Sequence, residues 1–286
     1  MTQPAESFND IAPTAFLAAY WRQFSGTPYA QEVFDAAAEV WTGYGQEMPN
    51  LYPQRTYRGP TMEARHRVGN ILLARAGNTQ TLDLAAGLSV RGLQHTAAHQ
   101  DSRYVELDLP IMSRVKQDTL ARLGTSALGV QYWQEPGSAL DPEAIERAVN
   151  HFDPARQVSV FCEGFLHYLD DAERAQVAAN VATVLRRFGG VWITDLPHHP
   201  DAETAAIAPR FHAAGTNRNV SELAFPNRQA ALTFFTGQGF NAPEEEAFGY
   251  ELIVDQLVSP TRLGLTRDEV AAQQRPWGMH VLRLAA

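Results

Sequence analysis

Residues 157–169, QVSVFCEGFLHYL, decide the fold, because an apolar run is interrupted there by one glutamate and a glycine. A short run of valine, phenylalanine and cysteine is typical of a strand that is buried on both faces of a sheet. An ionised Glu163 inside such a strand is unfavourable unless a positive group pairs with it. We therefore expect either that the strand ends at Glu163 or that a positively charged side chain lies opposite it.

The clearest predicted helix follows this strand. Asp170 or Asp171 can cap its first turn, and Gly189-Gly190 can end it. The next segment, VWITDL (191–196), reads as another buried strand. A strand, a helix and a second strand in succession form the unit of a parallel sheet. The apolar face of the helix consists of Val177, Val181, Val184, Leu185 and Phe188.

Similar apolar runs, separated by segments with helical spacing, occur on both sides of this unit. Strands that alternate with helices predict an α/β fold with a mostly parallel sheet flanked by helices. The candidate strands are TLDLAA (81–86), RYVELDL (103–109), LGVQYW (128–133), VSVFCE (158–163), VWITDL (191–196) and MHVLRLA (279–285).

The first 76 residues differ from the rest, since they are rich in aromatic residues and in Pro or Gly turns. Helical segments are predicted near residues 14–40 and 62–75. No polar or Pro/Gly/Ser linker follows residue 76. We therefore expect one structural domain, in which residues 1–76 are a helical extension or lid packed on a core formed by residues 77–286.

Composition restricts the possible functions. The chain has 286 residues, 45% of them apolar, which is ample for a large core. Its net charge of −9 disfavours nonspecific binding to nucleic acid or to an anionic membrane, so we expect neither partner. The single cysteine, Cys162, cannot form an internal disulfide, and neither a leader nor an apolar stretch of transmembrane length is evident. We expect a cytoplasmic protein, and the predominance of arginine over the one lysine, Lys116, hints at a bacterial source.

In an open parallel sheet, ligands bind beyond the carboxyl ends of the strands, where the strand order reverses. The loop after the first strand, DLAAGLSVRG (83–92), is usually the centre of that region. Gly87 allows the backbone to approach a ligand closely, because any side chain would fill the space. A plain turn is the alternative explanation for this glycine.

A second candidate residue lies at the end of the next strand. Asp108 follows Gly87 by 21 residues, and a carboxylate at this offset can accept both hydroxyl groups of a ribose. Alternatively, Asp108 caps the helix that begins at Pro110. Together, the glycine and the carboxylate predict a cofactor that contains a nucleoside.

The sequence lacks both the GxGxxG loop that cradles a dinucleotide and the GK[ST] loop that binds a triphosphate. S-adenosylmethionine has no phosphate, and its ammonium, sulfonium and carboxylate groups call for acidic side chains and a cation. Glu163 can face the positive end of this cofactor. In ARHR (64–67), Arg65 or Arg67 can bind its carboxylate. An ion pair between Glu163 and a core arginine is the alternative.

Three motifs of the chain resemble those of a known family. LDLAAGLSVRG (82–92) looks like a first cofactor loop, VELDLPIMSRVK (105–116) like an E-x-D-x-P followed by a lysine, and EGFLHYL (163–169) like an E-G-x-L-x-Y-L. All three are typical of the leucine carboxyl methyltransferase family, which includes bacterial O-methyltransferases of polyketide biosynthesis. Two weaker matches extend the resemblance toward the N-terminus: TAFLAAYWRQF (14–24) and ARHRVGNILL (64–73).

The resemblance, which covers about residues 14–196, implies the class I methyltransferase fold. This is a Rossmann-like sheet of seven mostly parallel strands flanked by helices, with S-adenosyl-L-methionine as the cofactor. The resemblance further implies that Arg65 holds the methionine carboxylate and that Gly87 lies against the cofactor. It implies that Asp108 accepts the ribose hydroxyls and that Glu163 contacts the amino group.

The same resemblance places the region around Gln134 and Glu135, after the third strand, beside the adenine. The chain also departs from the family pattern. Gln134 and Asn70 stand where the family has aspartates. Ala85-Ala86-Gly87 replaces the usual Gly-x-Gly, so that a methyl group must fit where a hydrogen is usual.

The implied reaction is methyl transfer to a carboxyl or hydroxyl oxygen of a small-molecule acceptor. A carboxylate acceptor is already ionised at neutral pH and needs no base, whereas a hydroxyl acceptor benefits from one. His198 and His199, in the loop after the fifth strand, are the candidate bases, and a solvated turn is the alternative. Tyr168, with His167, can line the acceptor side or merely hydrogen-bond the neighbouring loop. We expect no metal, because adjacent histidines point in different directions and no third ligand is evident.

Three other functions remain open at this point. A nicotinamide-dependent oxidoreductase is disfavoured by the missing GxGxxG loop. A noncatalytic homologue that still binds the cofactor finds mild support in Ala85 and Gln134. The third is methylation of the C-terminal carboxylate of a protein. The short chain favours a metabolite over a protein as the acceptor, and the oligomeric state is left open.

Overall fold

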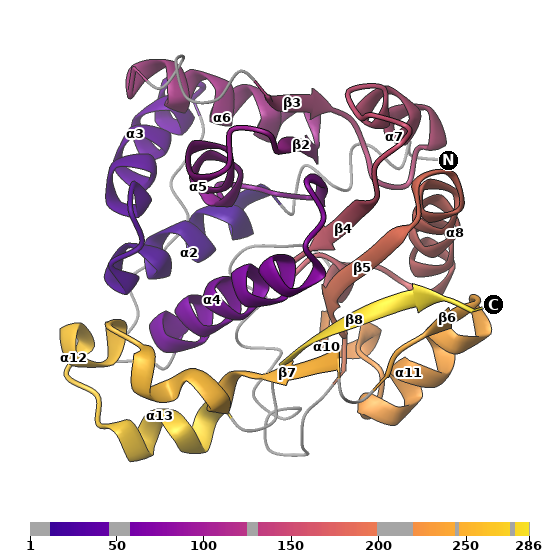
Figure 1. Ribbon diagram of the computed structural model, residues 1–286. Helices are drawn as coiled ribbons and strands as arrows, with labels where there is room; N and C mark the ends of the chain where they lie inside the picture. The colour runs from indigo at the N-terminus through magenta and orange to yellow at the C-terminus, as the bar shows by residue number, and fades with distance from the viewer. Residues whose placement is uncertain are drawn as a thin grey trace.

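The centre of the computed structural model is a twisted sheet (Figure 1). Residues 12–45, 58–124, 131–198, 220–243, 246–274 and 278–285 are described. Their strands are β1 (Gln80–Leu84), β2 (Arg103–Asp108), β3 (Tyr132–Pro136), β4 (Val158–Cys162), β5 (Gly190–Asp195), β6 (Phe240–Asn241), β7 (Ala247–Gly249) and β8 (Gly278–Leu284). They lie in the order β3-β2-β1-β4-β5-β8-β6, with β7 also paired to β8. β1 to β5 are parallel and β8 is antiparallel to its neighbours, so the chain reverses its direction of travel across the sheet at β1 and β4.

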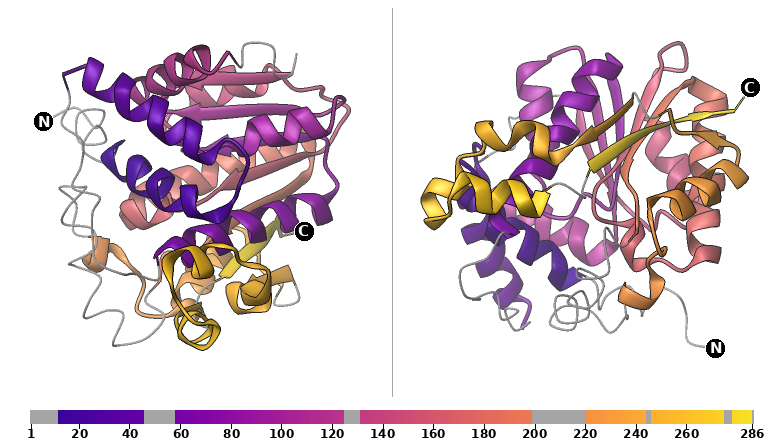
Figure 2. Two further views of the ribbon diagram at one scale, coloured as in Figure 1. Left: turned by 90° about the vertical axis from the view of Figure 1, so that its left-hand side faces the viewer. Right: turned by 90° about the horizontal axis from the view of Figure 1, so that it is seen from below.

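Helices cover both faces of this sheet (Figures 1 and 2). The described helices before β4 are α2 (Ala12–Arg22), η1 (Gln23–Ser25), α3 (Ala30–Gly43), α4 (Arg58–Ala76), α5 (Arg91–Ala98), α6 (Pro110–Arg122) and α7 (Pro142–Val149). Those after β4 are η3 (Leu166–Tyr168), α8 (Asp171–Phe188), α10 (Val220–Leu223), α11 (Arg228–Gly237), η5 (Tyr250–Gln256), α12 (Ser259–Leu263) and α13 (Arg267–Gln274). One apolar cluster joins α7, α8 and α11 to the sheet, and another joins α4 and η5 to it.

Strand β4 illustrates why these residues form a central strand. Val160 and Cys162 belong to the apolar cluster with α7 and α8, whereas Phe161 belongs to the cluster with α4. Successive side chains of a strand point to opposite faces, and both faces are covered here. Burial of each large apolar side chain contributes about 1.5–3 kcal/mol. A continuous apolar run is therefore the sequence that this position requires.

The strand, helix and strand predicted around Glu163 are confirmed. β4 ends at Cys162, so Glu163 lies just beyond the strand. Asp170 caps α8, and its carboxylate and that of Glu173 form a reciprocal capping box. Gly189 ends the helix with a φ of 70°, a backbone conformation that glycine adopts without strain.

The fold class is also confirmed, because the described residues form a mostly parallel α/β sheet flanked by helices. The sheet has eight strands where seven were expected, and the short strand β7 beside β8 is outside the expected order. The final strand was predicted at residues 279–285 and is observed as β8, Gly278–Leu284.

The third strand, predicted at residues 128–133, is observed as β3, which spans Tyr132–Pro136, and residues 128–130 lie outside the described residues. The predicted end of this strand is wrong, because Gln134 and Glu135 lie within the strand instead of after it. β3 is at the edge of the sheet and all of its residues are partly exposed. An edge strand does not need an apolar sequence, and the apolar pattern therefore ended the predicted strand three residues too soon.

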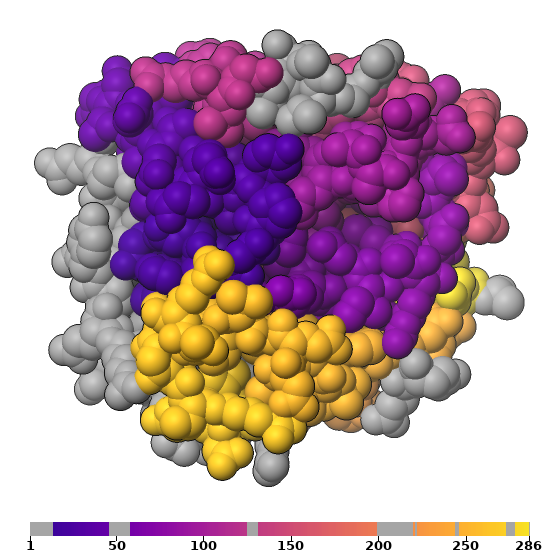
Figure 3. All heavy atoms as spheres, turned by 60° about the vertical axis from the view of Figure 1, so that its left-hand side comes forward, coloured from indigo at the N-terminus to yellow at the C-terminus, as the bar shows by residue number. Residues whose placement is uncertain are grey.

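Helix α4 is contacted by α2, from the N-terminal part of the chain, and by η5 and α12, from the C-terminal part. α2 and α3 pack against α6 through an apolar cluster that includes Phe16 and Trp41. α12 contacts both α4 and η1, and Figure 3 shows the N-terminal helices (indigo) beside the C-terminal segment (yellow). The buried Glu63 of α4 accepts the backbone N–H groups of Val258 (2.9 and 3.0 Å) and Ser259 (2.8 Å) at the start of α12. The division of the chain at residue 76 stays a prediction.

Candidate functional site

Three of the residues predicted to bind a cofactor lie at the carboxyl ends of neighbouring central strands. β2, β1 and β4 are neighbours whose paired residues end at the same level. Asp108 is the last residue of β2, Glu163 follows β4 directly, and Gly87 lies in the loop after β1. This is the place where the strand order reverses, which is the usual ligand site of such a sheet.

The loop after β1 has a defined backbone. Ala85 (φ 55°) and Gly87 (φ 53°) both adopt the left-handed conformation. The N–H of Ala85 donates to the carbonyl oxygen of Leu107 (2.8 Å), and the N–H of Gly87 donates to Oδ2 of Asp108 (2.6 Å). A Cβ atom on Gly87 would lie 3.1 Å from Cβ of Ala15 in α2. Gly87 is therefore required both by its backbone angle and by the close approach of α2.

Asp108 joins the end of β2 to this loop. Its second oxygen, Oδ1, accepts the N–H of Leu109 (2.7 Å). Burial raises the pKa of Asp108 to about 6, although the hydrogen bonds from Gly87 and Leu109 favour the ionised form. Helix α6 begins after Leu109 without a side-chain cap, so the alternative role of Asp108 as a helix cap is wrong.

Glu163 lies among three arginines that come from three different segments. Nε of Arg65 donates to Oε1 (3.0 Å), Nη2 of Arg22 lies 3.5 Å from the same oxygen, and Nη2 of Arg91 pairs with Oε2. Burial alone would raise the pKa of Glu163, but the guanidinium groups of Arg65, Arg91 and Arg22 lower it to about 2. Both expectations for Glu163 therefore hold, since the strand ends there and positive groups lie opposite it.

The structure separates the two arginines of the ARHR motif. Arg65 points to Glu163 and lies 3.7 Å, by Nη1, from Oδ2 of Asp195 at the end of β5. Arg67 pairs with Glu63 instead (2.8 Å). Gly164 has a φ of 71°, and a Cβ atom there would lie 2.7 Å from Nη1 of Arg65. The glycine after Glu163 thus leaves room for the Arg65 guanidinium.

Further buried charges lie beneath the cofactor loop. Lys116 pairs with Glu106 (2.5 Å) and donates to the carbonyl oxygen of Ser89 (2.5 Å). The lysine of the second motif thereby ties β2 to the loop. Asp83 accepts the hydroxyl of Tyr104 (2.7 Å), and burial, together with the neighbouring carboxylate of Glu106, raises its pKa to about 7.

Gln134 and Glu135 lie on the β3 side of Asp108. Oε1 of Glu135 lies 2.6 Å from Nε2 of His151, and Nε2 of Gln134 donates to the hydroxyl of Tyr132 (3.1 Å). β3 pairs with β2 up to Asp108, so both residues are close along the sheet to the predicted ribose site.

The candidate catalytic residues differ in their surroundings. Tyr168 in η3 is partly buried, and burial raises its pKa. His198 is 7% exposed, so the alternative of a solvated turn is wrong for this residue. His199 lies outside the described residues. His167, next to Tyr168, has Nε2 3.4 Å from Oδ2 of Asp195.

Three residues of this site were not predicted: Arg22, Arg91 and Asp195. Arg22 and Arg91 stand within motifs that were recognised, yet nothing in the spacing showed that they would meet Glu163. Both are buried, at 4% and 2% exposure. Asp195 lies near the end of a predicted strand, as Asp108 does. This shared position is the sequence feature that could have identified Asp195 as a site residue. Its carboxylate accepts the N–H of Gly164 (2.9 and 3.1 Å).

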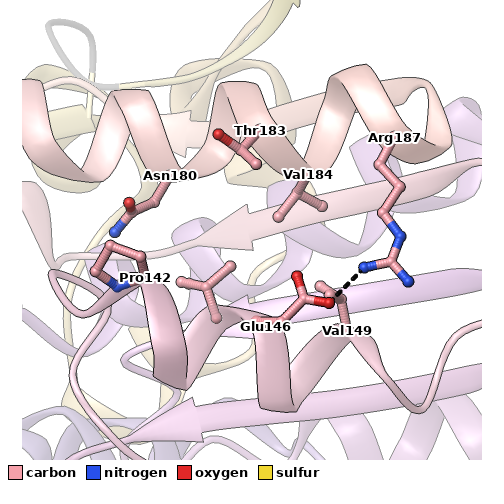
Figure 4. Close-up of a pocket in the computed structure, with 8 residues that line it drawn as sticks. Pro142, Glu146, Val149, Asn180, Thr183, Val184 and Arg187 are labelled. Carbon is pink, nitrogen blue, oxygen red and sulfur yellow. Dashed lines mark hydrogen bonds and ion pairs between the residues drawn. The ribbon is translucent and has the colours of Figure 1, made fainter.

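Other parts of the described chain offer less chemistry. A groove between α7 and α8 is lined by Pro142, Ile145, Val149 and Val184 together with polar side chains, and the Glu146–Arg187 ion pair (2.7 Å) crosses it at one end (Figure 4). It contains none of the residues predicted to bind the cofactor. Within the described residues there is no group of three or more His, Cys, Asp or Glu that could hold a metal ion. No helix in those same segments is long and apolar enough to cross a membrane.

Comparisons with known proteins bear on the family and the fold of the chain. A family model described as leucine carboxyl methyltransferase matches residues 28–182. A DUF574 family protein from Streptomyces avermitilis has a similar structure (TM-score 0.57, 18% identity, covering 95% of this chain and 97% of that one). A putative methyltransferase from Thermobifida fusca is also similar (TM-score 0.56, 18% identity, 94% of each chain). So is a mitomycin 7-O-methyltransferase (TM-score 0.51, 13% identity, 96% of this chain and 73% of that one). None of the curated proteins matches the sequence.

Proposed function

We propose, because this chain belongs to the leucine carboxyl methyltransferase family, that it binds S-adenosylmethionine and transfers the methyl group to an oxygen of a small molecule. One observation carries the proposal. A residue after β1, one at the end of β2 and one after β4 come together where the strand order reverses. The side chains there include a carboxylate for a ribose and an Arg–Glu pair for the two charges of an amino acid.

The residues of the site fit the cofactor in polarity. Asp108 presents a carboxylate to the ribose hydroxyls, and Gly87 lets the backbone approach the nucleoside. The methionine end of the cofactor carries an ammonium and a carboxylate. Arg65 and Glu163, which are joined by a hydrogen bond of 3.0 Å, carry the two opposite charges that would pair with these groups. We assign the carboxylate to Arg65 and the ammonium to Glu163.

The adenine side of the site is assigned to Gln134 and Glu135. Both lie on β3, which is the neighbour of the strand that ends in Asp108. The carboxylate of Glu135 already contacts His151, so Gln134 is the better candidate for a direct contact with the base.

When bound, S-adenosylmethionine supplies an electrophilic methyl group on a sulfonium. The main task of the protein is then to hold the acceptor oxygen at roughly 3–3.5 Å from that carbon and to exclude water. A carboxylate acceptor needs no base, whereas a hydroxyl acceptor would lose its proton to His198 or His199, with Tyr168 lining the acceptor side.

Calorimetric titration of the purified protein tests the proposal. We expect saturable binding of S-adenosylmethionine and none of NAD or NADP, and we expect Asp108→Asn to weaken the binding by about tenfold or more, because a charge-assisted hydrogen bond contributes about 1.5–3 kcal/mol. Glu146→Gln, in an exposed ion pair of α7, is the control and should bind as the unmodified protein does. Binding of NAD in place of S-adenosylmethionine would refute the proposal.

Turnover is measured separately, because a noncatalytic homologue would also bind the cofactor. Conversion of S-adenosylmethionine to S-adenosylhomocysteine is followed with panels of carboxylic acids, phenols and alcohols, and with peptides that end in a free carboxylate. Turnover with the peptides alone would assign the acceptor to proteins instead of metabolites.

A further inference from the structure

A carboxylate and an imidazole meet beyond the carboxyl end of β5. The cofactor is assigned above to the loop after β1 and to the ends of β2, β3 and β4. β5 is the next strand along the sheet, so an acceptor can approach the methyl group on this side of the site. Asp195 is the last residue of β5, and His167 lies in η3, just after β4.

Asp195 is held in place by two neighbouring groups. Its carboxylate oxygens accept the N–H of Gly164 at 2.9 and 3.1 Å, and Nη1 of Arg65 lies 3.7 Å from Oδ2. The side chain is 6% exposed. Burial alone would raise the pKa of Asp195, but the hydrogen bond and the charge of His167, followed by the charge of Arg65, lower it. Asp195 is therefore ionised at neutral pH.

Asp195 in turn orients the ring of His167. Nε2 of His167 lies 3.4 Å from Oδ2 of Asp195 and donates a hydrogen bond to it. The nitrogen that donates carries the proton of a neutral imidazole, so Nδ1 is then the basic nitrogen. The side chain of His167 is 16% exposed, so part of it remains accessible to another molecule. A buried carboxylate that orients a partly exposed imidazole is an arrangement that can accept a proton.

His198, the described candidate base after β5, has different surroundings. It lies near His280 of β8 and Arg228 of α11, because the pKa of His280 is lowered to about 3, first by burial and then by the charges of Arg228 and His198. A proton on His198 would add positive charge beside this arginine, whereas a proton on His167 is stabilised by Asp195. His167 is therefore the better proton acceptor of the two.

We propose that His167, oriented by Asp195, is the base that takes the proton of a hydroxyl acceptor, so that the substrate is an alcohol or a phenol. This inference rests on the proposed function and adds to it a catalytic residue, a positioning residue and a choice of acceptor. In the step, the acceptor oxygen bonds to the methyl carbon and the carbon–sulfur bond breaks, with its electron pair left on sulfur. The hydroxyl proton passes to Nδ1 of His167. A carboxylic acid is already ionised at neutral pH and has no proton to give to this pair.

The protonated nitrogen of His167 can be observed without any acceptor. Long-range proton–nitrogen NMR spectra of the histidine-labelled protein distinguish the two neutral forms of an imidazole, and His167→Gln identifies the signals of His167 by removing them. We expect the proton of neutral His167 on Nε2, because Asp195 accepts it there. A proton on Nδ1 would overturn the inference. The spectra are those of the unmodified protein, so the result does not depend on the activity of a variant.

Two classes of acceptor test the base by turnover, with phenols and alcohols in one panel and carboxylic acids in the other. We expect His167→Gln to lower kcat with hydroxyl acceptors by about 10²–10⁴-fold, the usual contribution of a general base, and to change the affinity for S-adenosylmethionine by less than about twofold. Asp195→Asn should cause a smaller loss, since its amide oxygen can still accept the N–H of Gly164 but carries no charge to stabilise the imidazolium. His99→Gln, which replaces an exposed histidine just after α5, is the control and should change neither quantity.

The pH dependence of kcat distinguishes a base from a structural residue. Five other charged or titratable groups surround the pair: Arg65, Glu163, Tyr168, Tyr250 and His280. The pKa of Glu163 is lowered to about 2 and that of His280 to about 3, burial raises the pKa values of both tyrosines, and that of Arg65 is raised. These five groups therefore keep their charge between about pH 5 and pH 8, the range in which an imidazole titrates.

We expect kcat with a hydroxyl acceptor to rise with pH through one step in that range, and we expect this step to be absent in His167→Gln. Asp195→Asn should move the step to lower pH, because loss of the carboxylate disfavours the imidazolium. Turnover of carboxylic acids alone, an unchanged kcat in His167→Gln, or loss of the step in His198→Gln instead would overturn the inference and leave the proposed function intact. Failure of the unmodified protein to bind S-adenosylmethionine would overturn both.

Discussion

Ala85 holds a backbone conformation that residues with a side chain rarely adopt. Its φ of 55° lies in the left-handed region, which costs about 1–2 kcal/mol for a residue other than glycine. The N–H of Ala85 donates to Leu107, so the ladder between β1 and β2 continues into this residue and holds it in place. The methyl group that replaces the usual hydrogen is accommodated through backbone strain.

Ala85→Gly should therefore stabilise the protein. The relief of about 1–2 kcal/mol is partly offset by the extra freedom of glycine in the unfolded chain, about 0.4–1 kcal/mol, so we expect a net gain of roughly 0.5–1 kcal/mol. Urea denaturation measures it. Ala86→Gly is the matched control, because Ala86 has no positive φ to relieve and the glycine should destabilise by about 0.4–1 kcal/mol. An Ala85→Gly variant less stable than the control would contradict this account.

The sequence predicted that Glu163 pairs with a positive group, but it did not predict that Arg22 and Arg91 would be among the partners. An acidic residue beside an apolar strand must find a positive group, and this physical requirement can be read from neighbouring residues alone. Which arginine supplies the charge cannot, since Arg22 and Arg91 approach from α2 and from the start of α5. Spacing along the chain does not encode a contact that only the packing of three segments creates.

At the scale of elements, one side chain fastens the C-terminal helices to α4. Glu63 is fully buried and accepts three hydrogen bonds from two backbone N–H groups of the α12 region, in addition to the ion pair with Arg67. Negative charge at the start of a helix is also favoured by the helix dipole. Glu63 thus fixes the start of α12 on α4, next to the apolar cluster that joins η5 to the same helix.

Glu63→Gln should loosen that segment and little else. The amide offers one acceptor oxygen in place of two and carries no charge, so we expect faster hydrogen exchange in residues 253–274 and unchanged exchange in β4. Exchange measured by mass spectrometry distinguishes the two regions. Glu146→Gln, in an exposed ion pair, should alter neither. A uniform increase over the whole chain would show that Glu63 serves overall stability instead of docking.

The bounds of a strand were predicted more accurately when the strand is buried. β4 and β5 are covered on both faces, so their apolar runs marked them correctly. β3 is half-exposed at the edge, and its sequence YWQEP does not resemble a strand. The edge position also brings Gln134 and Glu135 into the sheet, where their polar side chains remain accessible to a ligand.

At the scale of the whole molecule, the buried acids give stability a defined pH dependence. The pKa of Glu163 is lowered to about 2, whereas burial raises that of Asp108 to about 6 and that of Asp83 to about 7. Stability from Glu163 is present above its unfolded pKa of 4.5 and is lost as the pH falls toward 2. Stability from the two aspartates is complete below 3.8 and is lost as the pH rises through 6 and 7.

We therefore expect Asp83→Asn to flatten the fall in unfolding free energy between about pH 4 and pH 7. The asparagine oxygen can still accept the hydroxyl of Tyr104, and the variant removes a group that must ionise while buried. Urea denaturation at several pH values measures the slope for both proteins. Glu222→Gln, at an exposed position of α10, is the control. Equal slopes for Asp83→Asn and the unmodified protein would contradict the assignment.

The position of β8 has a consequence for how the protein is made. β8 lies between β5 and β6 in the sheet, yet it is the last of the described strands to leave the ribosome. At about 5–20 residues per second, some seconds pass between the emergence of β5 and that of its neighbour. During that interval the nascent chain carries β5 with an open, hydrogen-bonding edge, which is the surface that other chains can pair with. We therefore expect the edge of β5 to be a site of mispairing until β8 has left the ribosome.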